Sequence, residues 1–258
     1  MKLMGVVNVT PDSFSDGGRF LHPEAAIAHG VELAEQGAEI LDVGGESSRP
    51  GAEPVSEEEE LRRVLPVVAG LAGHTVSVDT SKSAVAAAAL AAGAAIVNDV
   101  TALRGDPRMA PLVAEREATV VLMHMRGEPR TMQDEPVYGD VVAEVREFLA
   151  ARIEAAEAAG IDGGRIWVDP GIGFGKTSEH NIELLGRIGE LAELGRPLVV
   201  GTSRKSFIGR LDGSAAHERL GGTIASTVLA AAAGADVLRV HDVAEVAQAL
   251  ALADAVLG

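Results

Sequence analysis

Asp169 ends a short apolar run, 166–168, and is followed at once by Pro170 and a glycine-rich segment that contains Phe174. Proline and glycine make continuation as strand or helix improbable, so Asp169 is predicted where a strand opens into a loop. A carboxylate there can accept two parallel hydrogen bonds from a flat, N–H-rich ligand, and Phe174 can cover that ligand. An aspartate in this place can also simply cap the next helix. Recurrence of the same design along the chain favours ligand binding.

Hydrogen-bonding side chains also end nearly all of the remaining strand-like runs of the sequence. In chain order the ends carry Asn8, Asp42 with Glu46, Asp79, Asn98 with Asp99, Met123 with His124, Asp169, residues 201–206, and Arg239 with His241. One group (Asp79, Asn98, Asp169 and Lys205) offers acceptors, an amide and a cation. Such a set suits a neutral heterocycle with amino, ring N–H and carbonyl edges.

A second group of side chains offers mostly donors and suits phosphate oxygens. Its members are Asn8, Arg49, Arg239 and His241. Arg239 and His241 are two positions apart on one strand, so they point to the same side. Arg49 could instead be a solvated loop charge, and His241 a hydrogen-bonded histidine at the end of a strand. Their role as an anion site is a hypothesis at this stage.

Three aspartates have simpler structural explanations. Asp79 and Asp99 could both be helix caps, and for Asp99 we prefer that explanation. Asp42 could be a structural carboxylate of the fold, and it is left out of the predicted sites. The sequence contains no H-E-x-x-H pattern, no metal-spaced histidine cluster and no Ser-His-Asp order.

Short β-like runs alternate with helical stretches from end to end. The predicted strands are Leu3–Val9, Ile40–Val43, Val76–Asp79, Ile96–Asp99, Thr119–His124, Ile166–Asp169, Leu198–Gly201 and Val237–His241. The predicted helices are 24–36, one that starts at Ser56, 81–92, 107–117, 141–159, 179–194, 216–233 and one that starts at Asp242. Ser56 with Glu59 forms a capping-box pattern, and Ser178 is the predicted cap of 179–194.

This alternation implies parallel strands with right-handed crossovers, and eight such units in 258 residues match a (β/α)8 TIM barrel, an α/β fold. We predict a single domain over residues 1–258. The alternative is a doubly wound open sheet, but no G-x-G-x-x-G fingerprint follows the first strand. In a barrel the carboxyl ends of all strands converge on one face, so the polar side chains that end these strands are expected to meet there.

The net charge of −16 and a pI near 4.8 argue against a nucleic-acid partner or an anionic membrane surface. An anionic small molecule remains possible because a local cluster of cations can dominate its own cleft. The chain has no cysteine, which excludes disulfides and thiolate metal sites. With no signal peptide and no long apolar span, a cytoplasmic location is expected.

Seven motifs lie in order along nearly the whole chain: 8–18 (NVTPDSFSDGG), 44–51 (GGESSRPG), 77–80 (SVDT), 97–99 (VND), 169–176 (DPGIGFGK), 203–206 (SRKS) and 239–242 (RVHD). Together they resemble the dihydropteroate synthase family, pterin-binding TIM barrels that sulfonamides inhibit. Ser48 is a departure, since many members have threonine there, but the hydroxyl is retained. The segment that many members carry before the first strand is nearly absent.

The resemblance implies a transferase of folate biosynthesis. It implies condensation of 6-hydroxymethyl-7,8-dihydropterin pyrophosphate with p-aminobenzoate to give 7,8-dihydropteroate and pyrophosphate, with Mg²⁺ and a homodimer as commonly found in the family. An arylamine is neutral and nucleophilic at pH 7, so no strong general base is required. The departing pyrophosphate does need stabilisation, and we hypothesise an SN1-like displacement. A corrinoid-dependent methyltransferase barrel and a non-catalytic pterin-binding relative are the rival interpretations.

The resemblance also implies roles for individual residues. Pterin would be held by Asp79, Asn98, Met123, Asp169, Lys205 and Arg239. Pyrophosphate would be held by Asn8, Arg49, Arg239 and His241, with Asn8 also a ligand of Mg²⁺. The p-aminobenzoate site would consist of Phe14, Ser48, Pro50, Phe174, Lys205 and Ser206. The groups expected to act in catalysis are Lys205, Arg239, His241 and Asp16, the last on the first loop.

Overall fold

A computed structural model of the protein describes residues 1–10, 23–47, 52–127 and 131–257. Eight parallel strands form one sheet in the order β6-β5-β4-β3-β2-β1-β8-β7. Their bounds are Lys2–Asn8 (β1), Ile40–Gly44 (β2), Thr75–Asp79 (β3), Ile96–Asp99 (β4), Thr119–Met123 (β5), Ile166–Asp169 (β6), Val199–Val200 (β7) and Val237–Val240 (β8). A parallel bridge between Val168 and Leu198 joins the two outer strands, so the sheet closes. The predicted (β/α)8 barrel is confirmed.

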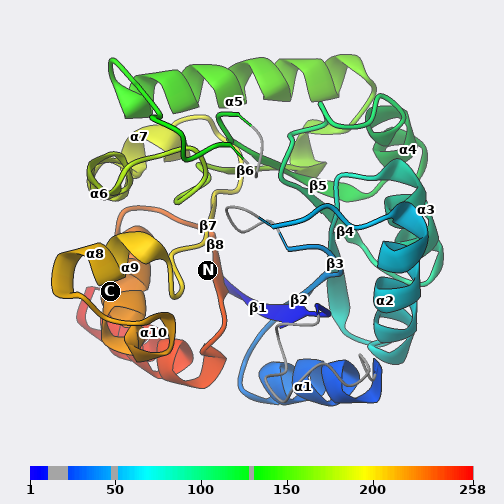
Figure 1. The fold of residues 1–258 in the computed structure, drawn as a ribbon, viewed down its shortest axis with the longest axis horizontal. Helices are drawn as coiled ribbons and strands as arrows, with labels where there is room; N and C mark the ends of the chain where they lie inside the picture. Colours follow the sequence, from blue (N-terminus) through cyan, green and yellow to red (C-terminus); the bar gives the residue numbers. More distant parts are fainter. Residues whose placement is uncertain (11–22, 48–51, 128–130, 258) are drawn as a thin grey trace.

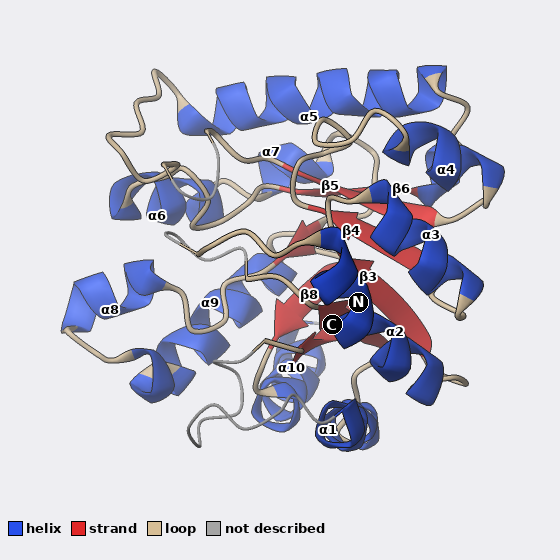
Figure 2. Cartoon of the chain, turned by 45° about the vertical axis from the view of Figure 1, so that its right-hand side comes forward, coloured by secondary structure: helices blue, strands red, loops and turns tan. Residues whose placement is uncertain are grey.

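Helices form a ring around the strands (Figure 1), and the same enclosure is visible from a second side (Figure 2). Their bounds are Pro23–Glu35 (α1), Glu57–Gly70 (α2), Ser83–Ala91 (α3), Met109–Glu115 (α4), Val141–Ala158 (α5), Ser178–Gly186 (α6), Gly189–Ala192 (α7), Ser206–Asp212 (α8), Leu220–Ala232 (α9) and Val243–Leu257 (α10). Buried Val, Leu, Ile and Ala side chains fill the layer between strands and helices. No helix of the described residues is long and apolar enough to cross a membrane.

Two predicted helices have different boundaries in the structure. The helix expected over 179–194 is divided into α6 and α7, because glycines 186 and 189 weaken helical continuation. Its cap is Thr177 rather than Ser178: the Thr177 hydroxyl accepts from the backbone N–H of His180. The helix expected over 216–233 begins only at Leu220, after a short 3₁₀ turn, and α8 was not predicted. Ser56 does cap α2, accepting from the N–H of Glu59 at 3.2 Å.

The interior of the barrel contains two layers of side chains that follow from the two-residue period of a strand. The lower layer is apolar and consists of Met4, Ile40, Ile96, Val121, Val199 and Val237, with Trp167 packed against it. Side chains two positions further along a strand point to the same face. On five of the strands these are Asp42, Asn98, Met123, Asp169 and Arg239, and Gly201 follows directly after β7. The upper layer is therefore mainly polar and lies towards the carboxyl ends of the strands.

Candidate active site

Arg239 on β8 connects carboxylates from two other strands. Its Nε donates to Asp42 Oδ2 at 2.6 Å, and its Nη2 donates to Asp79 Oδ2 at 3.0 Å. Asn98 Nδ2 donates to the same oxygen of Asp42 at 3.1 Å. Asp42, which the sequence suggested as a structural carboxylate, therefore supports two of the predicted site residues, Arg239 and Asn98. The signal for this role was its inward position, two residues after Ile40 on β2.

Burial controls the ionisation of this group. Burial, together with the negative charge of Asp42, raises the pKa of Asp79 to about 7, although Arg239 opposes the change. Burial would lower the pKa of Arg239, but the charges of Asp42 and Asp79 outweigh it and the net shift is upward. The guanidinium is therefore a permanent cation, whereas the Asp79 carboxyl group exchanges its proton near neutral pH.

Asp169 and Lys205 form the second part of the site. Asp169 Oδ1 accepts from the N–H of Gly171 at 2.6 Å. Lys205 Nζ donates to the carbonyl oxygen of Ile172 and lies 4.9 Å from the centroid of the Phe174 ring. Lys205 thus lies across the loop that follows β6, as expected if the two groups bind one ligand.

The two charges also affect each other. Burial raises the pKa of Asp169, and the charge of Lys205 opposes that rise. Burial lowers the pKa of Lys205 to about 8, and the charge of Asp169 opposes that fall. At neutral pH Lys205 is mainly protonated, so the site offers a cation beside an acceptor to a heterocycle.

His241 and Asn8 occupy the rim next to this group. The hydroxyl of Ser203 lies 3.0 Å from His241 Nδ1 and accepts from the backbone N–H of His241 at 3.2 Å. Asn8 ends β1, and in the register it pairs with Gly44, which in turn pairs with Asp79. Asn8 and Asp79 therefore lie on either side of a glycine that has no side chain to separate them from a ligand.

Three further predicted positions have clear places. Met123 ends β5 and belongs to a buried apolar cluster that includes Phe174. Ser206 is the first residue of α8, directly after Lys205. Asp99 was expected to cap a helix; its carboxylate instead accepts from Thr101 and from the N–H of Leu103, so it stabilises the turn after β4.

Five predicted site residues lie outside the described part of the chain. They are Phe14, Asp16, Ser48, Arg49 and Pro50. Their assigned roles stay predictions. Among the residues that the structure describes, no group of three or more His, Cys, Asp or Glu side chains could hold a metal ion.

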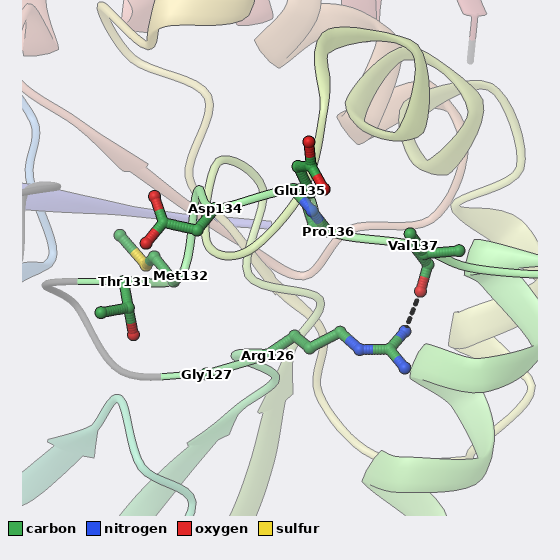
Figure 3. A pocket seen from close by; sticks show the side chains of 8 residues that line it. All are labelled: Arg126, Gly127, Thr131, Met132, Asp134, Glu135, Pro136 and Val137. Carbon is green, nitrogen blue, oxygen red and sulfur yellow. Dashed lines mark hydrogen bonds between the residues drawn. The ribbon is translucent and has the colours of Figure 1, made fainter.

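A separate hollow of about 270 Å³ lies in the segment after β5 (Figure 3). Its lining consists of Arg126, Gly127, Thr131, Met132, Asp134, Glu135, Pro136 and Val137. Arg126 spans it, donating to the carbonyl oxygen of Val137 (Figure 3) and lying 4.6 Å from the Tyr138 ring centroid. None of the predicted site residues lines this hollow.

Sequence reasoning did not identify two residues that hold the site together. Ser203 orients His241, and Lys176 is buried under the loop that carries Phe174. Both lie inside motifs that the sequence analysis had singled out, 203–206 and 169–176. Their types gave no sign of their roles, since a serine and a lysine in glycine-rich or polar loops are ordinarily exposed.

Residues 4–241 match the family described as pterin binding enzyme. A dihydropteroate synthase of Synechocystis sp. is 47% identical over 257 residues, which cover 98% of this chain and 89% of that protein. A structure of Xanthomonas albilineans dihydropteroate synthase with 4-aminobenzoic acid has a TM-score of 0.94 at 52% identity, covering 100% of this chain and 93% of that one.

A second structure of the Xanthomonas albilineans enzyme, in complex with 7,8-dihydropteroate, has a TM-score of 0.90 at 49% identity. It covers 100% of this chain and 94% of the other. The similarity therefore extends over nearly the full length of both molecules, in sequence and in fold. The chain belongs to the pterin-binding enzyme family, among the dihydropteroate synthases, and is a transferase.

Proposed function

We propose that the protein condenses 6-hydroxymethyl-7,8-dihydropterin pyrophosphate with p-aminobenzoate, forming 7,8-dihydropteroate and pyrophosphate. The observation that carries the proposal is the meeting of Asp79, Asn98, Asp169, Lys205 and Arg239 at one end of the barrel, although they come from separate strands or strand ends. Acceptors, an amide and cations in one layer match the edges of a pterin.

In this proposal Asp169 and Asn98 bind the pterin edge, and Met123 provides an apolar contact for the ring. Lys205 Nζ, which already lies between the Ile172 carbonyl and the Phe174 ring, faces both the pterin and the p-aminobenzoate. Arg239 lies against the ring while it remains tied to Asp42. Ser206, next to Lys205, belongs to the p-aminobenzoate site.

The reaction is a displacement at the pterin methylene carbon. The bond from this carbon to the pyrophosphate oxygen breaks, and the electron pair leaves with pyrophosphate; the amine nitrogen then forms the new bond and loses a proton. Arg239 and His241 stabilise the departing charge, each well-placed donor contributing on the order of a few kcal/mol. The carboxylates Asp79 and Asp169 offset positive charge on the pterin, which favours the SN1-like order of events.

Mg²⁺ is the expected partner of the pyrophosphate group. Mg²⁺ commonly takes one or two protein oxygens and completes its shell with phosphate oxygens and water. The amide oxygen of Asn8, at the rim beside Gly44, fits that pattern, and the described residues contain no larger cluster of ligands. When bound, the ion neutralises charge on the leaving pyrophosphate.

The test of the proposal is pyrophosphate release from the pterin substrate, measured with and without p-aminobenzoate and with and without Mg²⁺. We expect 7,8-dihydropteroate only when all components are present, and slow pyrophosphate release without the amine if departure precedes attack. Absence of release without the amine counts against the SN1-like order, and absence of product in the complete mixture refutes the condensation. Asp169→Ala is expected to abolish pterin affinity, whereas Arg239→Ala weakens binding of both ring and pyrophosphate.

A homodimer is the proposed assembly. Four of the exposed large apolar side chains among the described residues lie on α8 to α10: Leu211, Leu229, Leu252 and Val256. Their exposure, up to 73% for Val256, is consistent with a second copy covering this side. Sedimentation of the purified protein tests this assembly. A cytoplasmic location and inhibition by sulfonamides, competing with p-aminobenzoate, complete the proposal.

A further inference from the structure

Lys176 lies directly after the loop of the site and is only 2% exposed. Its Nζ lies 2.8 Å from His124 Nδ1 and 3.0 Å from the carbonyl oxygens of both Gly171 and Phe174. Backbone carbonyls and a ring nitrogen therefore surround this amine, whereas most buried lysines pair with a carboxylate. The role proposed above for the 169–176 motif does not use this residue.

His124 presents an acceptor to Lys176. Burial and the charge of Lys176 lower the pKa of His124 to about 2, so the imidazole is neutral at physiological pH. The ring is packed edge-on against Phe148, with centroids 4.8 Å apart, which fixes its orientation. Burial lowers the pKa of Lys176, and the charge of Asp169 opposes this. The amine has four acceptors around it: His124 Nδ1, the carbonyl oxygens of Gly171 and Phe174, and, at 3.5 Å, that of His124.

The loop itself lies against the chain that follows β5, with no room for side chains at the contact. A Cβ on Gly171, whose φ is +64°, would lie 1.9 Å from the carbonyl oxygen of His124. A Cβ on Gly175 would lie 2.4 Å from the carbonyl oxygen of Arg126. Close backbone approach alone does not set the position of the loop, because it supplies no directional bond. Lys176 supplies such bonds at both ends of 171–174.

Each of these bonds leads to a residue of the proposed site. The N–H of Gly171 donates to Asp169 Oδ1, and the carbonyl oxygen of Gly171 accepts from Lys176. The carbonyl oxygen of Phe174 also accepts from Lys176, and the Phe174 ring contacts Lys205. One buried amine therefore holds the loop at two points, the carbonyl oxygen of Gly171 near Asp169 and the carbonyl oxygen of Phe174.

We propose that Lys176 is a positioning residue, which acts through Gly171 and Phe174 to hold the Asp169 carboxylate and the Phe174 ring in their binding arrangement. His124 supports this arrangement because its Nδ1 accepts a hydrogen bond from Lys176 and so fixes the position of the amine. Lys176 itself touches neither substrate. The inference rests on the proposed function where it predicts kinetics, but its prediction for the order of the loop is independent of any substrate.

The first experiment compares the wild-type protein with Lys176→Met, whose side chain has similar length but no donor. Tyr138→Phe is the matched control, because the Tyr138 hydroxyl donates to the same loop, at the Gly175 carbonyl oxygen at 2.8 Å, from the outside. We expect Lys176→Met to raise the KM for both substrates about tenfold or more, with a smaller fall in kcat. Tyr138→Phe is expected to stay within about twofold of the wild type.

Amide hydrogen exchange in the absence of substrate gives the second readout. Lys176→Met is expected to speed exchange at Gly171 and Phe174 while the strands exchange as before. If Lys176→Met matches Tyr138→Phe in both KM values and in loop exchange, the inference is overturned. If the wild type forms no dihydropteroate, the proposed function fails instead, and loop exchange alone decides on Lys176.

A variant pair at His124 covers the case in which Lys176→Met does not fold. His124→Leu removes the acceptor, whereas His124→Asn keeps an amide oxygen near the place of Nδ1. We expect His124→Leu to raise both KM values and to loosen the loop, and His124→Asn to restore most of the wild-type behaviour. Equal behaviour of the two variants would contradict a positioning role for the Lys176–His124 contact.

Discussion

Asp42→Asn tests whether the buried carboxylate beneath Arg239 sets the electrostatics of the site. Asp42 is fully buried, and its pair with Arg239 is 2.6 Å long, with 23% of the Arg239 side chain exposed. Loss of one partner of a buried pair typically costs about 3–5 kcal/mol. The asparagine keeps an oxygen for Arg239, and Asp79 remains as a second partner. We therefore expect Asp42→Asn to lower the free energy of unfolding by about 2–3 kcal/mol.

The loss of stability in Asp42→Asn is expected to depend on pH, because the charge of Asp42 also raises the pKa of Asp79. The pKa of Asp79 is raised to about 7, above its unfolded value of about 3.8. Between these two pH values the folded protein holds a proton that the unfolded chain has released, so the free energy of unfolding falls as pH rises through this window. One pKa unit corresponds to about 1.4 kcal/mol, so the free energy of unfolding falls by about 4 kcal/mol over the whole window.

Without the charge of Asp42, the pKa of Asp79 is expected to drop. The decrease in the free energy of unfolding with rising pH is then expected to be smaller. At pH 5 Asp79 is protonated in the wild type, so Asp42→Asn only loses attraction to Arg239. At pH 8 Asp79 is ionised, and the substitution also removes its repulsion by Asp42. The variant is therefore expected to lose more stability at pH 5 than at pH 8.

Urea unfolding of both proteins at pH 5, 6, 7 and 8 provides the measurement. Glu190→Gln is the control: Glu190 makes two hydrogen bonds to Arg187, at 2.7 and 3.0 Å, but on the surface, where such pairs contribute little. A stability difference between wild type and Asp42→Asn that is the same at every pH would refute the coupling of Asp42 to Asp79. A difference no larger than that of the control would refute the buried pair itself.

Three further outcomes follow from the same geometry. The kcat/KM for the pterin substrate should decrease below about pH 7, as Asp79 takes up a proton, and above about pH 8, as Lys205 loses one. Lys205→Arg should remove the decrease above about pH 8. Gly171→Ala, which places a Cβ 1.9 Å from a backbone oxygen, should displace the loop and lower kcat/KM about a hundredfold, with circular dichroism confirming that the barrel is intact. Ser203→Ala, which removes one hydrogen-bond partner of His241, should lower kcat about fivefold in steady-state assays without changing the thermal unfolding temperature appreciably.

Local patterns sufficed to predict the strands and the polar rim. Apolar runs and the two-residue period mark both the strands and the side that faces inward, and the topology then brings their ends together. The sequence could not predict that Asp42 would bond to Arg239, 197 positions away, because period and composition carry no information about partners. The division of the helix over 179–194 depends on glycines whose effect is decided by packing. Lys176 was missed because burial of an amine depends on loop conformation.

The proposed pterin substrate is anionic although the protein is strongly acidic, and the charges of the upper layer bear on how the two can combine. Asp42, Asp79 and Asp169 face Lys205 and Arg239, so three carboxylates meet two cations. Burial raises the pKa of Asp79 to about 7, and the negative charge of Asp42 adds to the rise, so this carboxyl group can take up a proton near neutral pH. When Asp79 is ionised, three carboxylates face two cations, and the net negative charge of the layer offsets positive charge on the pterin. Arg239 is paired with Asp42 and Asp79, so part of the attraction for pyrophosphate has to come from donors at the rim, and the described candidates there are His241 and Asn8.

If the layer serves mainly the ring and the rim mainly the anion, His241→Asn should weaken binding of inorganic pyrophosphate while leaving binding of a pterin without pyrophosphate unchanged, as titration calorimetry can measure. Equal weakening of both ligands would show that ring and anion share one set of charges.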